Sequence, residues 1–366
     1  MRFLLSAIII LILNFSTRGQ DLSSQKDRAE SVYLRLRNIN FVKNNEYFNP
    51  IVEGYTLIGY FIQPSLIYCL TDRLNIQIGA HLLNYAGSKK LAAPKLVFST
   101  SYNLTKNSTL TLGTLNGSEK HRLADPHFDK ERLYKYYTEN GLQFVTVTDR
   151  IFSDTWVSWE NFILKGDTTR EIFTAGESFN FQSRNFRGNI NFELPVQLQF
   201  KHYGGQISNY DDHVTTYFNM SAGVRINFDL ADGDFGRASV EYDRFVFNEL
   251  TRKGEIGITH GHADWFRLLY NYRSVGVSTS FWRSNDFYAP NGNPIYSSVS
   301  DYNSNLVIAG RSIWSSSVYV RSRPYEFFTI YLGFDLYYDV DRKKYDNSFA
   351  IHLYLNKLIK IAKMNK

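Results

Sequence analysis

The chain has 366 residues, a formal net charge of +6 and 21% charged residues, a composition close to that of soluble proteins. Its mean hydropathy of -0.31 argues against a helical membrane protein. Lysine and arginine are spread along the chain rather than gathered in one basic run, so nucleic acid is not an expected partner. Aromatic residues are unusually frequent at 16%, and Tyr and Phe favour strands and membrane interfaces.

The first predicted element is a cleaved signal peptide in residues 1–19. Arg2 supplies a positive start, Phe3 to Phe15 is almost wholly apolar, and Thr17 and Gly19 are small residues placed for cleavage. This order of features is typical of secretory signals. The alternative is an N-terminal membrane helix, but the apolar stretch is shorter than the roughly 20 residues that a span needs.

From residue 31 onward, segments of about ten residues alternate in polarity. In 189–201, for example, Phe192 and Leu194 alternate with Asn191 and Glu193. A period of two indicates strands, and such lengths suit strands that cross a bilayer. We expect about sixteen strands, within a range of 14–18, at 31–42, 55–69, 74–85, 93–103, 108–117, 140–148, 154–164, 171–182, 189–203, 212–228, 237–249, 264–272, 275–284, 306–321, 326–339 and 346–357.

The connections between these strands are alternately short and long. Short periplasmic turns and longer outer loops are the arrangement found in membrane β-barrels. The predicted fold class is therefore all-β, a transmembrane antiparallel β-barrel with a polar, wet lumen. The expected organisation is a signal peptide at 1–19, a leader at 20–30, the barrel at 31–358 and a basic tail at 359–366.

This pattern resembles bacterial outer-membrane porins. The resemblance depends on the signal peptide, the ten-residue alternation and the final strand at 346–357. Many such barrels end in an aromatic residue, whereas this chain continues through Leu358 to Lys366. The resemblance implies an outer-membrane channel for passive passage of small hydrophilic solutes, with outer-membrane lipid and the barrel-assembly machinery as partners. It leaves open whether the barrel forms a homo-oligomer.

Two other functions stay open. The barrel could have a closed lumen and act as a binding or structural protein, or it could be a membrane-embedded hydrolase. The sequence contains no G-x-S-x-G elbow, HExxH motif or P-loop, which are signatures of common enzyme classes. We therefore expect no enzyme activity and no cofactor, while noting that the fold itself does not exclude catalysis.

Charged residues at inward-facing positions are the candidates for solute selectivity, because rings of charge set ion preference in pores. Their mixed signs predict no strong preference for anions or cations. These lumen candidates are Glu193, Lys201, Arg225, Arg267 and Arg311.

The longest connection, 118–139, carries a second set of candidates: His121, Asp125, His127 and Asp129. In porins a long loop often folds inward and narrows the pore, so these charges could tune selectivity. The interpretation we favour is a solvated outer loop.

His260, His262 and Asp264 lie at i, i+2 and i+4, so an extended strand would point them the same way. Imidazole and carboxylate together could bind a transition metal. The favoured alternative is a polar stripe near a strand end with incidental histidines.

Overall fold

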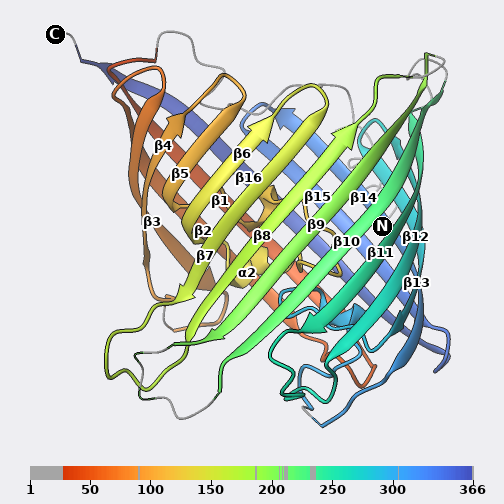
Figure 1. The fold of residues 1–366 in the computed structure, drawn as a ribbon. Coiled ribbons are helices and arrows are strands. Elements are labelled where there is room, and N and C mark those ends of the chain that lie inside the picture. Colours follow the sequence, from red (N-terminus) through yellow and green to blue (C-terminus); the bar gives the residue numbers. More distant parts are fainter. Residues whose placement is uncertain are drawn as a thin grey trace.

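The computed structural model describes residues 28–89, 91–185, 188–205, 207, 209, 213–230, 236–303 and 305–364. Sixteen antiparallel strands in this part of the chain close into one barrel (Figure 1). They are β1 (Ser31–Glu46), β2 (Thr56–Cys69), β3 (Leu74–Tyr85), β4 (Lys95–Asn103), β5 (Ser108–Thr114), β6 (Asn140–Val147), β7 (Ile151–Asn161), β8 (Glu171–Gln182), β9 (Ile190–Gly204), β10 (Thr215–Asp229), β11 (Arg237–Glu249), β12 (His260–Tyr272), β13 (Val275–Asn285), β14 (Gly310–Tyr325), β15 (Phe328–Asp339) and β16 (Lys344–Lys363).

Each strand pairs with its neighbours in the sequence, and β1 pairs with β16 to close the sheet. The predicted fold class and strand number are confirmed. Closure leaves no unpaired sheet edge, which is the condition for placing strands in lipid. The predicted signal peptide at 1–19 lies outside the described residues. Among the helices that the structure describes, none is long and apolar enough to span a membrane.

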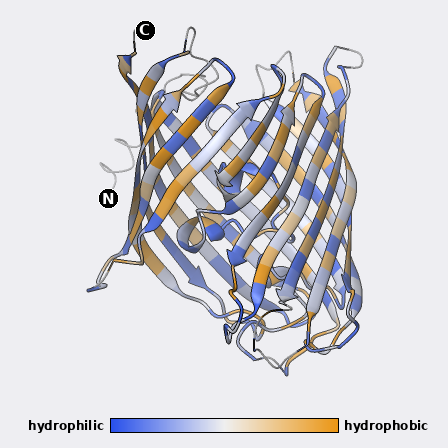
Figure 2. Ribbon diagram, turned by 60° about the vertical axis from the view of Figure 1, so that its left-hand side comes forward, coloured by the Kyte–Doolittle hydropathy of each residue, from blue (hydrophilic) through white to orange (hydrophobic). Residues whose placement is uncertain are grey.

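Hydrophobic and hydrophilic residues alternate along the strands (Figure 2). Large apolar side chains such as Leu96 and Leu112 are more than 60% exposed on the outer face, as expected for a wall that contacts lipid. Their neighbours in the sequence, Val97 and Thr111, are buried on the inner face. The period of two therefore sorts side chains between lipid and lumen.

The two ends of the barrel differ in their connections. β1 begins and β16 ends at the end with short turns, which corresponds to the periplasmic side of known barrels. β16 continues to Lys363 because it keeps pairing with the start of β1, where Ser31 is opposite Lys363. Residues 359–363, expected to be a basic tail, thus belong to the last strand.

Two long connections turn into the barrel instead of covering its outer mouth. Residues 115–139 follow β5 and contain the 3-10 helix η2 (Ser118–Lys120) and the short helix α2 (Arg132–Lys135), which lies inside the barrel in Figure 1. Residues 286–309 follow β13 and contain the 3-10 helix η4 (Pro294–Tyr296). The expected solvated outer loop at 118–139 is wrong, because its histidines are fully buried.

Candidate functional site

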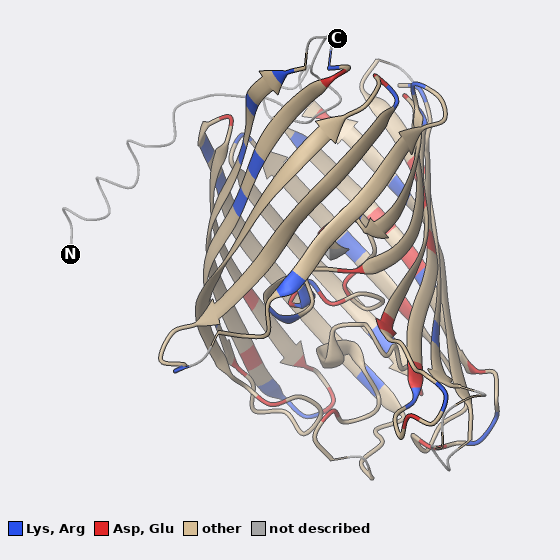
Figure 3. Cartoon of the chain, turned by 90° about the vertical axis from the view of Figure 1, so that its left-hand side faces the viewer, with Lys and Arg blue, Asp and Glu red and all other residues tan. Residues whose placement is uncertain are grey.

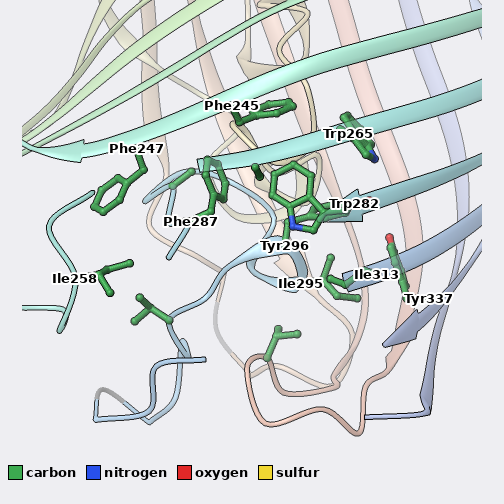
Figure 4. Packing of buried hydrophobic residues seen from close by; sticks show 14 of the residues in the cluster. Phe245, Phe247, Ile258, Trp265, Trp282, Phe287, Ile295, Tyr296, Ile313 and Tyr337 are labelled. Atoms are coloured by element: carbon green, nitrogen blue, oxygen red, sulfur yellow. The ribbon is translucent and has the colours of Figure 1, made fainter. Parts of the chain in front are cut away.

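The outer half of the lumen is filled by an aromatic plug, defined as Phe245, Trp265 and Trp282 of the wall together with Phe287 and Tyr296 of the second inner loop (Figure 4). The ring centroids of Trp282 and Phe287 lie 5.1 Å apart, as do those of Trp282 and Tyr296. Trp282 and Phe245 are 0% exposed. Such packing of aromatic rings excludes water from the space between them, so the interior of the plug is dry.

Arg311 anchors the second inner loop from β14. Its Nη1 donates hydrogen bonds of 2.6 Å to the carbonyl oxygens of Ile295 and Ser297, and its Nη2 lies 3.6 Å from a carboxylate oxygen of Asp339. The guanidinium therefore satisfies backbone acceptors that would otherwise be buried unpaired. Arg311 faces the lumen as predicted, but it is buried on the long-loop side of Trp282, opposite Ser284, and not beside open water.

The first inner loop is held by His121. Its Nδ1 lies 2.9 Å from Asp154 Oδ2 and its Nε2 lies 2.8 Å from Glu139 Oε2, and its ring stacks on Trp156 at 3.8 Å. Gly176 on β8 leaves the room that Trp156 occupies, since a Cβ there would lie 2.5 Å from the indole. Burial by itself would lower the pKa of His121, but hydrogen bonds and charge from the two carboxylates outweigh it and raise the pKa to about 9.

The other three loop candidates lie in different surroundings: His127 is buried, whereas Asp125 and Asp129 are partly exposed and line a cavity. His127 lies against the rings of Phe245 and Phe287, at centroid distances of 4.8 and 6.4 Å, and burial lowers its pKa to about 3. Asp125 accepts a 2.9 Å hydrogen bond from Asn293 Nδ2, which joins the two inner loops. Burial, and then the charge of Asp125, raise the pKa of Asp129 to about 7.

The other half of the lumen, toward the short turns, holds a cavity of about 760 Å³, which we call the vestibule. Figure 3 shows charged residues of both signs on the strands and on the loops inside the barrel. Arg267, Arg321, Asp335 and Glu326 are among those that line the vestibule. The channel is thus wet at one end and filled at the other.

All five predicted lumen candidates are paired with opposite charges, Arg311 with Asp339 as described above. Arg225 bridges Glu193 and Glu241 at 3.3 and 2.9 Å, and Arg267 lies 2.6 Å from Glu241. Lys201 lies 2.5 Å from Glu160. The strands place all these side chains on the inner face, as the alternation predicts, while their role in solute selectivity stays a prediction.

His260, His262 and Asp264 share one face of β12, and that face is the outer one. Asp264 accepts hydrogen bonds from Arg244 at 2.5 Å and from the hydroxyl of Tyr242 at 2.7 Å. Among the described residues there is no group of three or more His, Cys, Asp or Glu side chains placed to hold a metal ion. Alternate residues of a strand lie about 6–7 Å apart, which is too far for a compact metal site.

A second polar group on the outer wall lies near the long-loop end, where β9 ends and β10 begins. His202 Nδ1 and Thr216 Oγ1 are 2.9 Å apart. The imidazole stacks on Phe173 at 4.8 Å, and Phe173 contacts Trp159 at 5.2 Å. Trp159 Nε1 donates to Glu171 Oε1 at 2.9 Å. A hydroxyl within hydrogen-bond distance of an imidazole is the geometry of a nucleophile and its base.

The sequence-based search missed this pair. His202 continues the apolar face of 189–201, where ionisable groups are costly in lipid and are functional candidates for that reason. The position of His202 on the outward-facing side of this alternation is the feature of the sequence that could have identified it. Thr216 carries no signal of its own, because only the register of β9 with β10 brings it opposite His202.

Comparison with protein families gives one match. The model of the lipid A 3'-O-deacylase-type family matches residues 24–364. The chain belongs to this family. The expectation that the chain is not an enzyme is therefore corrected, since the family is one of enzymes. A catalytic site assembled from separate strands contains no contiguous motif such as G-x-S-x-G, so the absence of these motifs does not argue against an enzyme. No curated protein sequence matches the chain.

Solved structures show the same fold. OmpT of Vibrio cholerae, an outer membrane protein with loop L8 deleted, has a TM-score of 0.54 and 10% identity over 89% of this chain and 99% of its own. OprD of Pseudomonas aeruginosa has a TM-score of 0.54 and 9% identity over 94% and 99%. OccAB2 of Acinetobacter baumannii has a TM-score of 0.50 and 10% identity over 91% and 100%. The chain is an outer-membrane type β-barrel.

Proposed function

We propose that this barrel hydrolyses an acyl ester of a lipid in the outer leaflet, with lipid A as the substrate that its family suggests. The observation that carries the proposal is the Thr216–His202 pair on the lipid-facing wall. It lies near the long-loop end, the end that faces the outer leaflet in barrels of this class. Lipid esters reach this wall by lateral diffusion and need no passage through the lumen.

The proposed chemistry is acyl transfer to the threonine. As Thr216 Oγ attacks the ester carbonyl, its proton passes to His202 Nδ1, and the new C–O bond forms at Oγ. The ester bond to the sugar oxygen then breaks, and that oxygen takes the proton from the imidazolium. Water, deprotonated by His202, then attacks the acyl-threonine carbonyl; the bond from that carbon to Thr216 Oγ breaks, Oγ takes the proton back from the imidazolium, and the fatty acid is released. Phe173 and Trp159 provide an aromatic surface beside the pair for the acyl chain.

Incubation of the purified, detergent-folded chain with lipid A, followed by mass spectrometry, tests the proposal. The wild type should release a fatty acid, and Thr216→Val and His202→Phe should each reduce the rate by about 100-fold or more. Thr279→Val, on the same outer face but bonded to Trp314, is the matched control and should keep the rate. Full activity in both site variants would exclude this pair, and no release by the wild type would overturn the hydrolase itself.

A channel for small hydrophilic solutes is the second candidate, and the charged vestibule of about 760 Å³ favours it. The aromatic plug disfavours it, because Trp282 and Phe287 pack together inside the lumen and narrow it at their level. Single-channel recording in planar bilayers separates the two: stepwise conductance supports the channel, and a silent bilayer supports the closed lumen. For either function, we also propose that residues 1–19 direct export and that the barrel-assembly machinery inserts the chain. A homo-oligomeric state is proposed as well.

A further inference from the structure

Three rings form a continuous stack on the vestibule wall. Tyr319 on β14 stacks with Tyr331 on β15 at a centroid distance of 5.9 Å, and Tyr331 stacks with His352 on β16 at 5.1 Å with only 14° between the planes. We call these three residues the ring ladder. All of them line the vestibule. Gly333 permits this arrangement, because a Cβ there would lie 2.6 Å from the hydroxyl of Tyr331.

Hydrogen bonds from the wall and from α2 inside the lumen fix the ladder. The hydroxyl of Tyr319 donates to Asn271 Oδ1 at 2.7 Å. Both nitrogens of His352 are engaged, Nε2 with the hydroxyl of Tyr134 at 2.6 Å and Nδ1 with that of Tyr354 at 3.0 Å. Rings held in this way keep their orientation before any ligand arrives, which reduces the entropy cost of binding.

An arginine lies next to the ladder. Arg321 is opposite Tyr331 in the register of β14 and β15, and its Cζ lies 5.8 Å from the centre of that ring. Within the described residues, Arg321 makes no ion pair with Asp or Glu shorter than 4 Å. Asp335 lies farther along the same wall, opposite Ser317, and is engaged with the hydroxyls of Ser317 and Ser348 at 2.6 and 3.2 Å. A guanidinium that lines a cavity and has no carboxylate partner within ion-pair distance is suited to an anionic ligand.

We propose that the vestibule binds a short anionic saccharide that enters from the short-turn side. The flat face of a sugar ring packs on an aromatic face such as that of Tyr319 or Tyr331, which are partly exposed. A carboxylate on the sugar pairs with Arg321. The cavity volume falls within the roughly 300–1,000 Å³ of ligand pockets. Because the plug fills the lumen toward the outer end, the saccharide binds in the vestibule and does not pass through the barrel. This site is inside the barrel and independent of the proposed hydrolysis on the outer wall.

Titration calorimetry of the full chain in detergent, with trigalacturonic acid as the probe and maltotriose as its neutral counterpart, tests the proposal. We expect the wild type to bind trigalacturonic acid at least 10-fold more tightly than maltotriose. Arg321→Gln should remove that preference, while Tyr331→Ala should weaken both sugars by about 10-fold. Arg150→Gln, on an exposed turn between β6 and β7, should change neither. Unchanged electrophoretic mobility before boiling shows that each variant is folded.

Several outcomes would overturn the proposal. They are the absence of trigalacturonic acid binding in the folded wild type, equal binding by the Arg321→Gln variant, and binding of inorganic phosphate in place of the sugar acid. Failure here leaves lipid A hydrolysis intact, since Thr216 and His202 lie on the opposite face of the wall and are unchanged in every variant.

Discussion

The two halves of the lumen are made by the same strands but differ in the polarity and packing of their inward-facing side chains. On β11, the inner face carries Glu241 and Asp243 in the middle of the barrel and changes to Phe245 and Phe247 toward the long loops. The carboxylates pair with arginines of neighbouring strands, whereas the rings pack on loop residues. The comparison teaches that alternation decides which side chains point inward, while depth along the strand decides whether the interior is wet or dry.

The largest expected effect comes from His121→Ala in the first inner loop, whose neighbours Lys120 and Arg122 line the vestibule. It leaves Glu139 and Asp154 buried without their shared cation, and removing one partner of a buried ion pair costs about 3–5 kcal/mol. We expect that loss in the free energy of unfolding, measured by urea titration in detergent with electrophoretic mobility as the readout. His260→Ala, on the exposed end of β12, is the control. Equal stabilities would show that the loop is held by other contacts.

Replacing one tryptophan on each face of the wall compares the stability contributed by a ring in the plug with that contributed by a ring facing lipid. Trp282→Ala removes a fully buried ring from the plug, and such truncations cost about 3–4 kcal/mol through lost contacts and the cavity left behind. Trp314 on the adjacent strand is 52% exposed on the outer face, so Trp314→Ala should cost much less in the same unfolding titration. A similar cost for both would mean that the plug is loosely packed.

Substitution of two lumen arginines compares the contribution of a charged side chain to stability in the two halves of the lumen. Arg311→Gln breaks buried bonds to Ile295 and Ser297 carbonyls, and charged hydrogen bonds of this kind contribute about 1.5–3 kcal/mol. Arg225 has a side chain that is 31% exposed, so solvent screening should reduce the cost of Arg225→Gln to about 1 kcal/mol. The reverse order of stabilities would contradict a dry outer half.

The smallest expected effect is a change with pH. Because the pKa of His121 rises to about 9 from 6.5 on folding, its contribution to stability is complete below pH 6.5 and is lost as pH rises through about 9. Hydrogen exchange of the first inner loop should therefore accelerate between pH 8 and pH 10 beyond its intrinsic chemical rate. The His121→Gln variant should lack this excess. Acceleration that persists in His121→Gln would assign it to another group.

The candidate sites show where sequence-based prediction ends. Alternation placed Glu193, Arg225 and Arg267 on the inner face, because a strand turns each successive side chain to the opposite side. It gave no information on their ion pairs, which depend on the register between strands. His202 and Thr216 meet for the same reason, since they belong to strands separated by an intervening loop.

The sequence alone determined the strands, their approximate ends, their closure into a barrel and the division of side chains between lipid and lumen. These follow from a period of two and from strand length, which are local properties of the chain. The tertiary structure decided that residues 115–139 and 286–309 fill the lumen. A loop carries no periodicity, so its position depends on contacts such as those of Trp282 with Phe287 and His121 with Asp154, which join residues far apart in the sequence.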